Sequence, residues 1–121
     1  MLQPVIHYGL HFIAPLGLSF LFFRENLWKA YAVMLASMIV DADHLLASPV
    51  FDPGRCSIGY HPLHTLYAIG AYLLLLIFWK KKYSRMLMTG LLFHMATDMT
   101  DCLLMFQDCS ACSEAFIKHL F

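Results

Sequence analysis

Residues 84–106 read SRMLMTGLLFHMATDMTDCLLMF, an almost continuously apolar stretch that is interrupted by His94, Asp98 and Asp101. A helix of roughly 20 mostly apolar residues is long enough to cross the hydrocarbon of a bilayer. In a helix, His94 and Asp98 are four residues apart and Asp98 and Asp101 are three apart, so the three side chains share one face. The stretch therefore predicts a membrane-spanning helix with one polar stripe.

Three further windows of the same kind precede it, at residues 4–23, 27–47 and 60–79. A segment in lipid must satisfy its own backbone hydrogen bonds, which favours helices. The sequence therefore predicts an all-α fold, a single domain over residues 1–121 that forms an integral membrane bundle of four transmembrane helices. We expect residues 107–121 to form a tail on the outer side.

Composition argues against an ordinary soluble domain. Of the 121 residues, 60% are hydrophobic and 13% are charged, whereas a typical soluble domain is about 45–50% apolar and about 25% charged. The formal net charge is zero, so the chain lacks the excess of basic residues with which proteins bind nucleic acid. Seven histidines stand out in a chain that is otherwise so poor in charge.

Lysine and arginine in short loops predict the orientation, because cytoplasmic loops are enriched in them. The second loop contains only Arg55, whereas the first and third loops together carry Arg24, Lys29, Lys80, Lys81, Lys82 and Arg85. We therefore expect an inner (plasma) membrane protein with the first and third loops in the cytoplasm. Both termini and the second loop would then lie outside.

On this topology each predicted helix brings polar side chains to the outer half or the midplane of the membrane. The ten residues concerned are His7, His11, Asp41, Asp43, His44, His61, His64, His94, Asp98 and Asp101. Ionisable residues inside a membrane are costly and usually mark function. The aspartates would repel one another without a positive charge. A divalent metal resolves this conflict; a structural polar core and a proton or ion path are the alternatives.

Helical spacing places these side chains on shared faces, and the ligands that we expect are His7, His11, Asp41, His44, His94 and Asp98, together with the pair that includes His64. Imidazole and carboxylate without thiolate suit zinc, the first candidate, and also manganese or iron. There are more candidate ligands than a single four-coordinate ion needs. Two arrangements therefore stay open: one ion whose ligands hydrogen-bond to the remaining residues, and a two-ion site. Asp43 and Asp101 are the expected catalytic residues, as a general base or as bridges to a second metal.

Two motifs carry a resemblance to a known family. Asp41-Ala42-Asp43-His44 matches a D-x-D-H pattern, and His94-Met95-Ala96-Thr97-Asp98 matches H-x-x-x-D. In these motifs the chain resembles the small bacterial membrane-bound metal-dependent hydrolases, and the resemblance covers nearly the whole chain. The hydrolase label of that family rests on similarity to zinc-dependent phospholipases. The resemblance therefore implies a reaction class rather than a substrate.

Members of that family also carry a histidine early in the first helix and a paired-histidine segment later. The corresponding residues here are His7 or His11, and then His61, His64 and Thr65. The paired histidines of the family are usually more widely spaced than His61 and His64. The resemblance therefore identifies His64 as the ligand and leaves the role of His61 open.

The four cysteines are Cys56, Cys102, Cys109 and Cys112. All lie outside or at the outer edge on the predicted topology, where an oxidising compartment permits two disulfides. Pairing Cys56 with Cys102 and Cys109 with Cys112 is one of three connectivities. A separate thiolate zinc site and free thiols are the alternatives.

Together these features predict a hydrolase in which a metal-activated water attacks an amphiphilic or phosphoester substrate at the outer face of the membrane. The partners would be the lipid bilayer and this substrate, and a homo-oligomer is compatible with so short a chain. The alternatives are a metal ion transporter or sensor without catalysis, a haem-binding bundle and a structural membrane protein. Transport predicts polar residues toward the inner ends, and haem explains histidines but not aspartates.

Overall fold

The computed structural model describes residues 2–50, 52 and 54–120, and over these residues it is helical and contains no strand. Its α-helices are α1 (Leu2–Phe22), α2 (Leu27–Ala36), α3 (Leu66–Phe78), α4 (Lys82–Asp108) and α5 (Ser110–Leu120). Its 3₁₀-helices are η1 (Arg24–Asn26), η2 (Ser37–Leu46) and η3 (Pro62–His64). The all-α prediction is confirmed.

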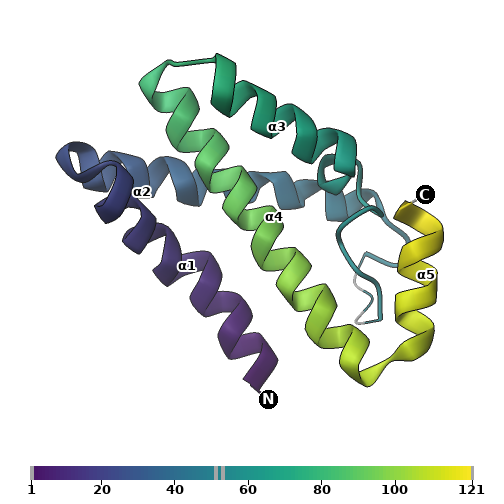
Figure 1. The fold of residues 1–121 in the computed structure, drawn as a ribbon. Helices are drawn as coiled ribbons and strands as arrows, with labels where there is room; N and C mark the ends of the chain where they lie inside the picture. The colour runs from purple at the N-terminus through teal and green to yellow at the C-terminus, as the bar shows by residue number, and fades with distance from the viewer. Residues whose placement is uncertain (1, 51, 53, 121) are drawn as a thin grey trace.

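Helix α4 is the central element of the fold, and every other α-helix contacts it. It runs diagonally through the molecule, with α3 on one side, α1 on the other and the α2–η2 segment crossing behind it (Figure 1). Side chains on α4 can therefore meet side chains from several elements at once.

The connections between helices alternate between two ends of the molecule. The turn between α1 and α2 lies near the turn between α3 and α4, while the N-terminus and α5 lie away from them (Figure 1). A cavity at the first end is lined from both sides, by Phe22 and Phe23 of one turn and by Lys80 and Lys82 of the other. The first and third loops thus share one end, as the distribution of basic residues requires.

The second predicted helix is a continuous rod of two different helix types. In α2 the buried residues are Ala30 and Met34, four apart, as the 3.6-residue turn of an α-helix requires. In η2 they are Ser37, Val40 and Asp43, three apart, as the three-residue turn of a 3₁₀-helix requires. With rises of about 1.5 and 2.0 Å per residue, the rod is about 35 Å long.

The third predicted helix begins later than the sequence indicates. Its N-cap is Thr65, whose hydroxyl oxygen accepts a hydrogen bond from the backbone N–H of Ala68 at 3.3 Å. The preceding residues turn at Gly59, which has φ of 82° and donates its N–H to the carbonyl of His64. This left-handed conformation favours glycine. Helix α3 is therefore about 20 Å long rather than the length of a full membrane span.

The second loop folds into the molecule instead of covering it from outside. It contributes Cys56 and Ile58 to the main apolar cluster, whose other buried members are Val40, Met88, Leu91, Met95 and Cys102. A disulfide between Cys56 and Cys102 fixes the loop to α4, and a second joins Cys109 to Cys112. This pairing is the one considered from the sequence.

The predicted tail is helix α5, which folds back against the end of α4. Phe116 packs against Phe106 of α4 with ring centroids 5.2 Å apart. Phe116 and Cys112 of α5 also line a cavity together with residues of the second loop.

Large apolar side chains are exposed on much of the outside of the molecule, while several histidines and aspartates lie within it. Tyr67 is 92% exposed and Ile39 is 81% exposed, whereas His64 and His94 are buried. In the described chain, one α-helix, Pro4–Phe22, is long and apolar enough to cross a membrane by length and composition alone. Helix α3 is apolar but shorter.

Candidate metal centre

Four side chains from three elements converge beside the middle of α4. They are Asp41 on η2, His64 on η3, and His94 and Asp98 on α4. Each offers one nitrogen or oxygen atom, and these four atoms lie within 4.8 Å of one another. The three residues other than Asp41 are buried.

The distances within this four-residue group match the edges of a small coordination polyhedron. The Nε2 atoms of His94 and His64 lie 3.0 and 3.3 Å from Asp41 Oδ1. The same two atoms lie 3.4 and 3.2 Å from Asp98 Oδ2. Ligands about 2.0–2.1 Å from a tetrahedral ion are about 3.3 Å from one another.

Within the described chain, one hydrogen bond joins members of this group, between Nε2 of His94 and Oδ1 of Asp41 at 3.0 Å, and two other buried atoms are left without a partner. His64 Nε2 and Asp98 Oδ2 are buried, and neither atom forms a hydrogen bond within the described chain, despite their separation of 3.2 Å. Ligands of one ion point at the ion rather than at each other. Buried polar atoms without partners are rare in proteins and call for an explanation. The group can therefore hold a metal ion.

The 3₁₀ conformation of η2 determines which residues face this group. Side chains three apart are eclipsed in a 3₁₀-helix, so Asp41 and His44 share one face and Asp43 falls on the buried face with Val40. Both aspartates of the D-x-D-H motif thereby reach the same neighbourhood from adjacent faces.

Close packing at Gly90 sets the distance between η2 and α4. A Cβ atom at Gly90 would lie 3.0 Å from the Cα of Met34 and 3.0 Å from the hydroxyl of Ser37. Because His94 follows Gly90 by about one helical turn, this contact allows His94 to reach Asp41.

Asp43 orients His64. Its Oδ2 accepts hydrogen bonds from the backbone N–H of Leu63 at 2.9 Å and from Nδ1 of His64 at 3.1 Å. With the proton on Nδ1, the lone pair of His64 Nε2 faces the four-residue group. A carboxylate behind a ligating histidine is a common arrangement in metal sites.

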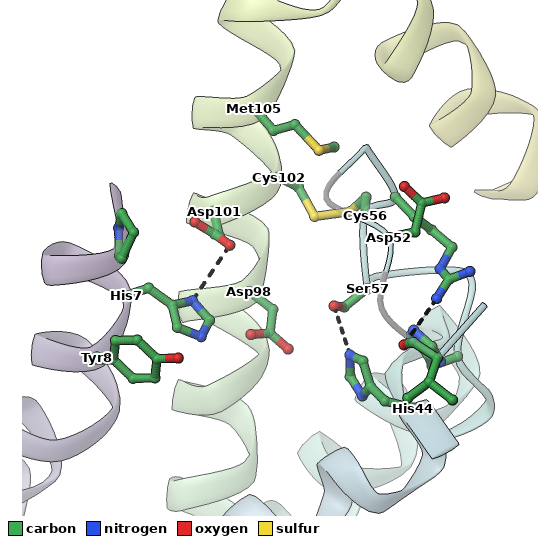
Figure 2. Close-up of a pocket in the computed structure, with 14 residues that line it drawn as sticks. His7, Tyr8, His44, Asp52, Cys56, Ser57, Asp98, Asp101, Cys102 and Met105 are labelled. Atoms are coloured by element: carbon green, nitrogen blue, oxygen red, sulfur yellow. Dashed lines mark hydrogen bonds and ion pairs between the residues drawn. A yellow bond between two sulfur atoms is a disulfide. The ribbon is translucent and has the colours of Figure 1, made fainter. Parts of the chain in front are cut away.

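His44 lies beside the four-residue group rather than within it. Its Nδ1 is 3.2 Å from the carbonyl oxygen of Asp41 and its Nε2 is 3.0 Å from the hydroxyl of Ser57 (Figure 2). With Asp43 and His64 it forms a separate group that can hold a metal. His61 stacks on the His44 ring at 3.8 Å and belongs to none of the three possible metal groups among the described residues.

The early histidines of α1 form another group with Asp98. His11 Nε2 lies 3.5 Å from Asp98 Oδ1, and the rings of His7 and His11 are 4.4 Å apart. His7 Nδ1 lies 3.5 Å from Asp101 Oδ2 (Figure 2). Atoms of His7, His11 and Asp98 lie within 4.8 Å of one another.

A cavity of about 410 Å³ opens beside these groups, between the start of α1, the second loop and α4. Its lining includes His7, Asp98 and Asp101 on one side and His44 and Ser57 on the other (Figure 2). The cavity gives small molecules a route to the buried carboxylates.

Arg55 is the one arginine or lysine that lines this cavity within the described chain. Its guanidinium donates a hydrogen bond to the carbonyl of Pro49 at 2.8 Å and lies 4.5 Å from the ring centroid of Tyr60. These contacts hold a positive charge at the rim of the cavity.

A family profile matches residues 1–105, which is most of the chain. The chain belongs to DUF6122, a family of unknown function. Neither a curated protein nor a solved structure matches the chain. The matched part of this DUF6122 chain contains all three metal groups, whereas α5 lies beyond it.

The expected site residues of the DUF6122 chain are thus divided among three adjoining groups. Each of the seven predicted ligands belongs to at least one of the three groups, and so does Asp43. The residues concerned are His7, His11, Asp41, Asp43, His44, His64, His94 and Asp98. Asp101 contacts the first histidine of α1 instead. Ser57 was not expected, because a serine in a loop gives no signal until the fold brings it to His44.

Proposed function

We propose that this DUF6122 chain is a membrane-embedded metal-dependent hydrolase whose metal ion is held by Asp41, His64, His94 and Asp98. The single observation that carries the proposal is the convergence of two imidazoles and two carboxylates with buried atoms that have no hydrogen-bond partner in the described chain. Two carboxylates balance the charge of a divalent ion. Zinc suits this donor set best, with manganese or iron as alternatives.

The residues around the ion have different roles in the proposed reaction. A divalent ion supplies Lewis acidity and an activated water at neutral pH. Asp43 holds His64 in the ligating tautomer through Oδ2, which accepts both hydrogen bonds, while its Oδ1 makes no hydrogen bond within the described chain. Asp101 lines the cavity and Asp43 does not, so Asp101 is better placed to take up a proton from a water in the cavity.

The chain crosses the membrane four times in this proposal, through α1, the α2–η2 rod, α3 with its preceding turn, and α4. The apolar exterior and the buried ionisable side chains support this arrangement. The basic residues near the α1–α2 and α3–α4 turns support a cytoplasmic location for that end. Two disulfides at the opposite end fit an oxidising outer compartment.

An amphiphilic phosphoester is the substrate class that the cavity fits. Its lining includes Tyr8, Val50 and Met105 beside the carboxylates and histidines, and Arg55 provides one positive charge. Arginine recognises phosphate through paired hydrogen bonds. The sequence resemblance to membrane-bound metal-dependent hydrolases favours the same reaction class.

The alternative of a metal transporter has less support. Among the described residues, the buried polar side chains outside the metal groups are Ser19, Ser37, Thr97 and His61, and the one ionisable side chain of these four, His61, stacks on His44 beside the centre. A transport path needs ionisable groups that continue toward the other face of the membrane.

The test compares metal content with hydrolysis. We expect protein purified in detergent without chelator to contain zinc, manganese or iron by elemental analysis, and to hydrolyse phosphoester lipids in vesicles until a chelator is added. His64→Ala should lose both bound metal and at least 100-fold in rate. His61→Ala is the matched control, because His61 is equally buried but lies outside the metal groups.

The same measurements also show which results would contradict the proposal. If His64→Ala keeps the full metal content of the native protein, or if loss of metal leaves hydrolysis unchanged, the proposed site is wrong. If metal is bound and taken up into vesicles but no lipid is hydrolysed, the transporter alternative is correct.

A further inference from the structure

We infer that the centre holds a second metal ion, bound by His7, His11 and Asp98, and that Asp98 bridges the two ions. This inference rests on the proposed function, because it extends the same centre. It assigns the α1 histidines to the ion that faces the cavity, and so to the ion that meets the substrate.

The two oxygens of Asp98 face two different sets of histidines. Oδ2 lies 3.2 Å from Nε2 of His64, in the four-residue group. Oδ1 lies 3.5 Å from Nε2 of His11, on α1. The carboxylate is 6% exposed, so its direction is fixed by packing. A carboxylate in this position joins two sites through its two oxygens, as in two-metal sites whose ions are about 3.5–4 Å apart.

A simple ion pair between His11 and Asp98 does not account for this arrangement. His11 is 4% exposed, yet its Nε2 makes no hydrogen bond within the described residues. The Nδ1 atom of His7 is also buried, and it too lacks a hydrogen bond there. One ligand atom each of His7, His11 and Asp98 lies within 4.8 Å of the other two, so one ion can meet all three.

Charge balance gives an independent argument for a second ion. The centre contains four carboxylates, Asp41, Asp43, Asp98 and Asp101, and no lysine or arginine is buried among the described residues. Two divalent ions match the formal charge of all four carboxylates, whereas one matches two of them. Buried charge is strongly unfavourable unless it is paired, and Asp43 and Asp98 are buried.

The two groups differ in how they can be used. The four-residue group already offers four ligands, so a water on its ion would be a fifth. The α1 group offers three ligands, which leaves a position open, as in catalytic sites. Of the two groups, His7 and Asp98 line the cavity, while Asp41, His64 and His94 do not.

The test is a count of bound ions. Full-length protein in detergent, stripped with chelator, is titrated with zinc alone, and bound metal is measured by elemental analysis and calorimetry. We expect two ions per chain for the native sequence and one for His11→Ala. With manganese, the native protein should show the electron paramagnetic resonance signal of a spin-coupled pair, and His11→Ala that of an isolated ion.

His7→Ala serves as the second variant, because His7 is partly exposed and its removal is less disruptive to packing than that of His11. It too should bind one ion, with unchanged helical content by circular dichroism. Saturation of the native protein at one ion, or two ions in both variants, overturns the second site and leaves the proposed function standing. No bound metal in the native protein overturns both.

Discussion

α2 and η2 are successive halves of one rod, and they bury their side chains at different spacings. α2 buries Ala30 and Met34, four apart, and packs as an ordinary helix against α4. η2 buries Ser37, Val40 and Asp43, three apart. Both halves pack against Gly90 of α4, through Met34 of α2 and Ser37 of η2, while the 3₁₀ half turns both motif aspartates toward the candidate metal centre.

The difference shows how a helix is adapted to carry a site. An α-helix separates side chains two apart by about 200°, so only one aspartate of the D-x-D-H motif would face the centre squarely. Long 3₁₀ segments are uncommon because their hydrogen bonds are poorer. Their presence inside a helical rod often marks a functional position.

The largest expected effect comes from removing the buried carboxylate of η2. Asp43→Ala leaves the donors of His64 and Leu63 without an acceptor, at a cost of about 1–3 kcal/mol for each. The free energy of unfolding, measured by denaturant titration in detergent, should fall by their sum. Asp52→Ala is the control, because this exposed carboxylate accepts from Gly54 in a surface turn, and its change should stay below about 0.5 kcal/mol. Equal effects would contradict the role of Asp43.

A smaller effect is expected at the contact between α2 and α4. Gly90→Ala places a methyl group 3.0 Å from the Met34 backbone, and overpacking of this kind costs about 1–3 kcal/mol. Gly70→Ala is the matched control within a helix, since no atom lies within 4 Å of its added Cβ. It should stabilise the protein by up to about 1 kcal/mol. Thermal unfolding of both variants measures the opposite signs, and stabilisation by Gly90→Ala would show that the rod is not tightly packed there.

The smallest expected effect tests the helix type of η2 itself. Val40 is 4% exposed and Leu45 is 71% exposed. Val40→Ala should cost about 1.5 kcal/mol from lost burial alone, whereas Leu45→Ala should change stability by less than about 0.5 kcal/mol. A regular α-helix continued from Met34 would bury Leu45, three turns later. A larger loss in Leu45→Ala than in Val40→Ala would therefore exclude the 3₁₀ conformation.

Long apolar windows with charged ends made α1 and α4 predictable from sequence. The predicted helices 4–23 and 84–106 correspond to Leu2–Phe22 and Lys82–Asp108. The 3₁₀ form of η2 was not predictable, because α- and 3₁₀-helices both bury a residue every three or four positions. The choice between them depends on contacts with His64 and α4 that the local sequence does not contain.

The grouping of the ionisable residues followed from their common depth and helical spacing. His94, Asp98 and Asp41 meet in the structure for this reason. The second loop was a different case, since Cys56 and Ile58 are buried while neighbouring residues are exposed. No periodic pattern marks such a loop, and so the contact of Ser57 with His44 was not foreseen.

The residues of the four-residue group are synthesised at different times. Asp41 and His64 leave the ribosome before His94 and Asp98, because synthesis proceeds from the N-terminus. On the proposed function, an ion that needs all four ligands is bound only after α4 has packed against η2. A chain in which α4 fails to pack there would then lack this ion.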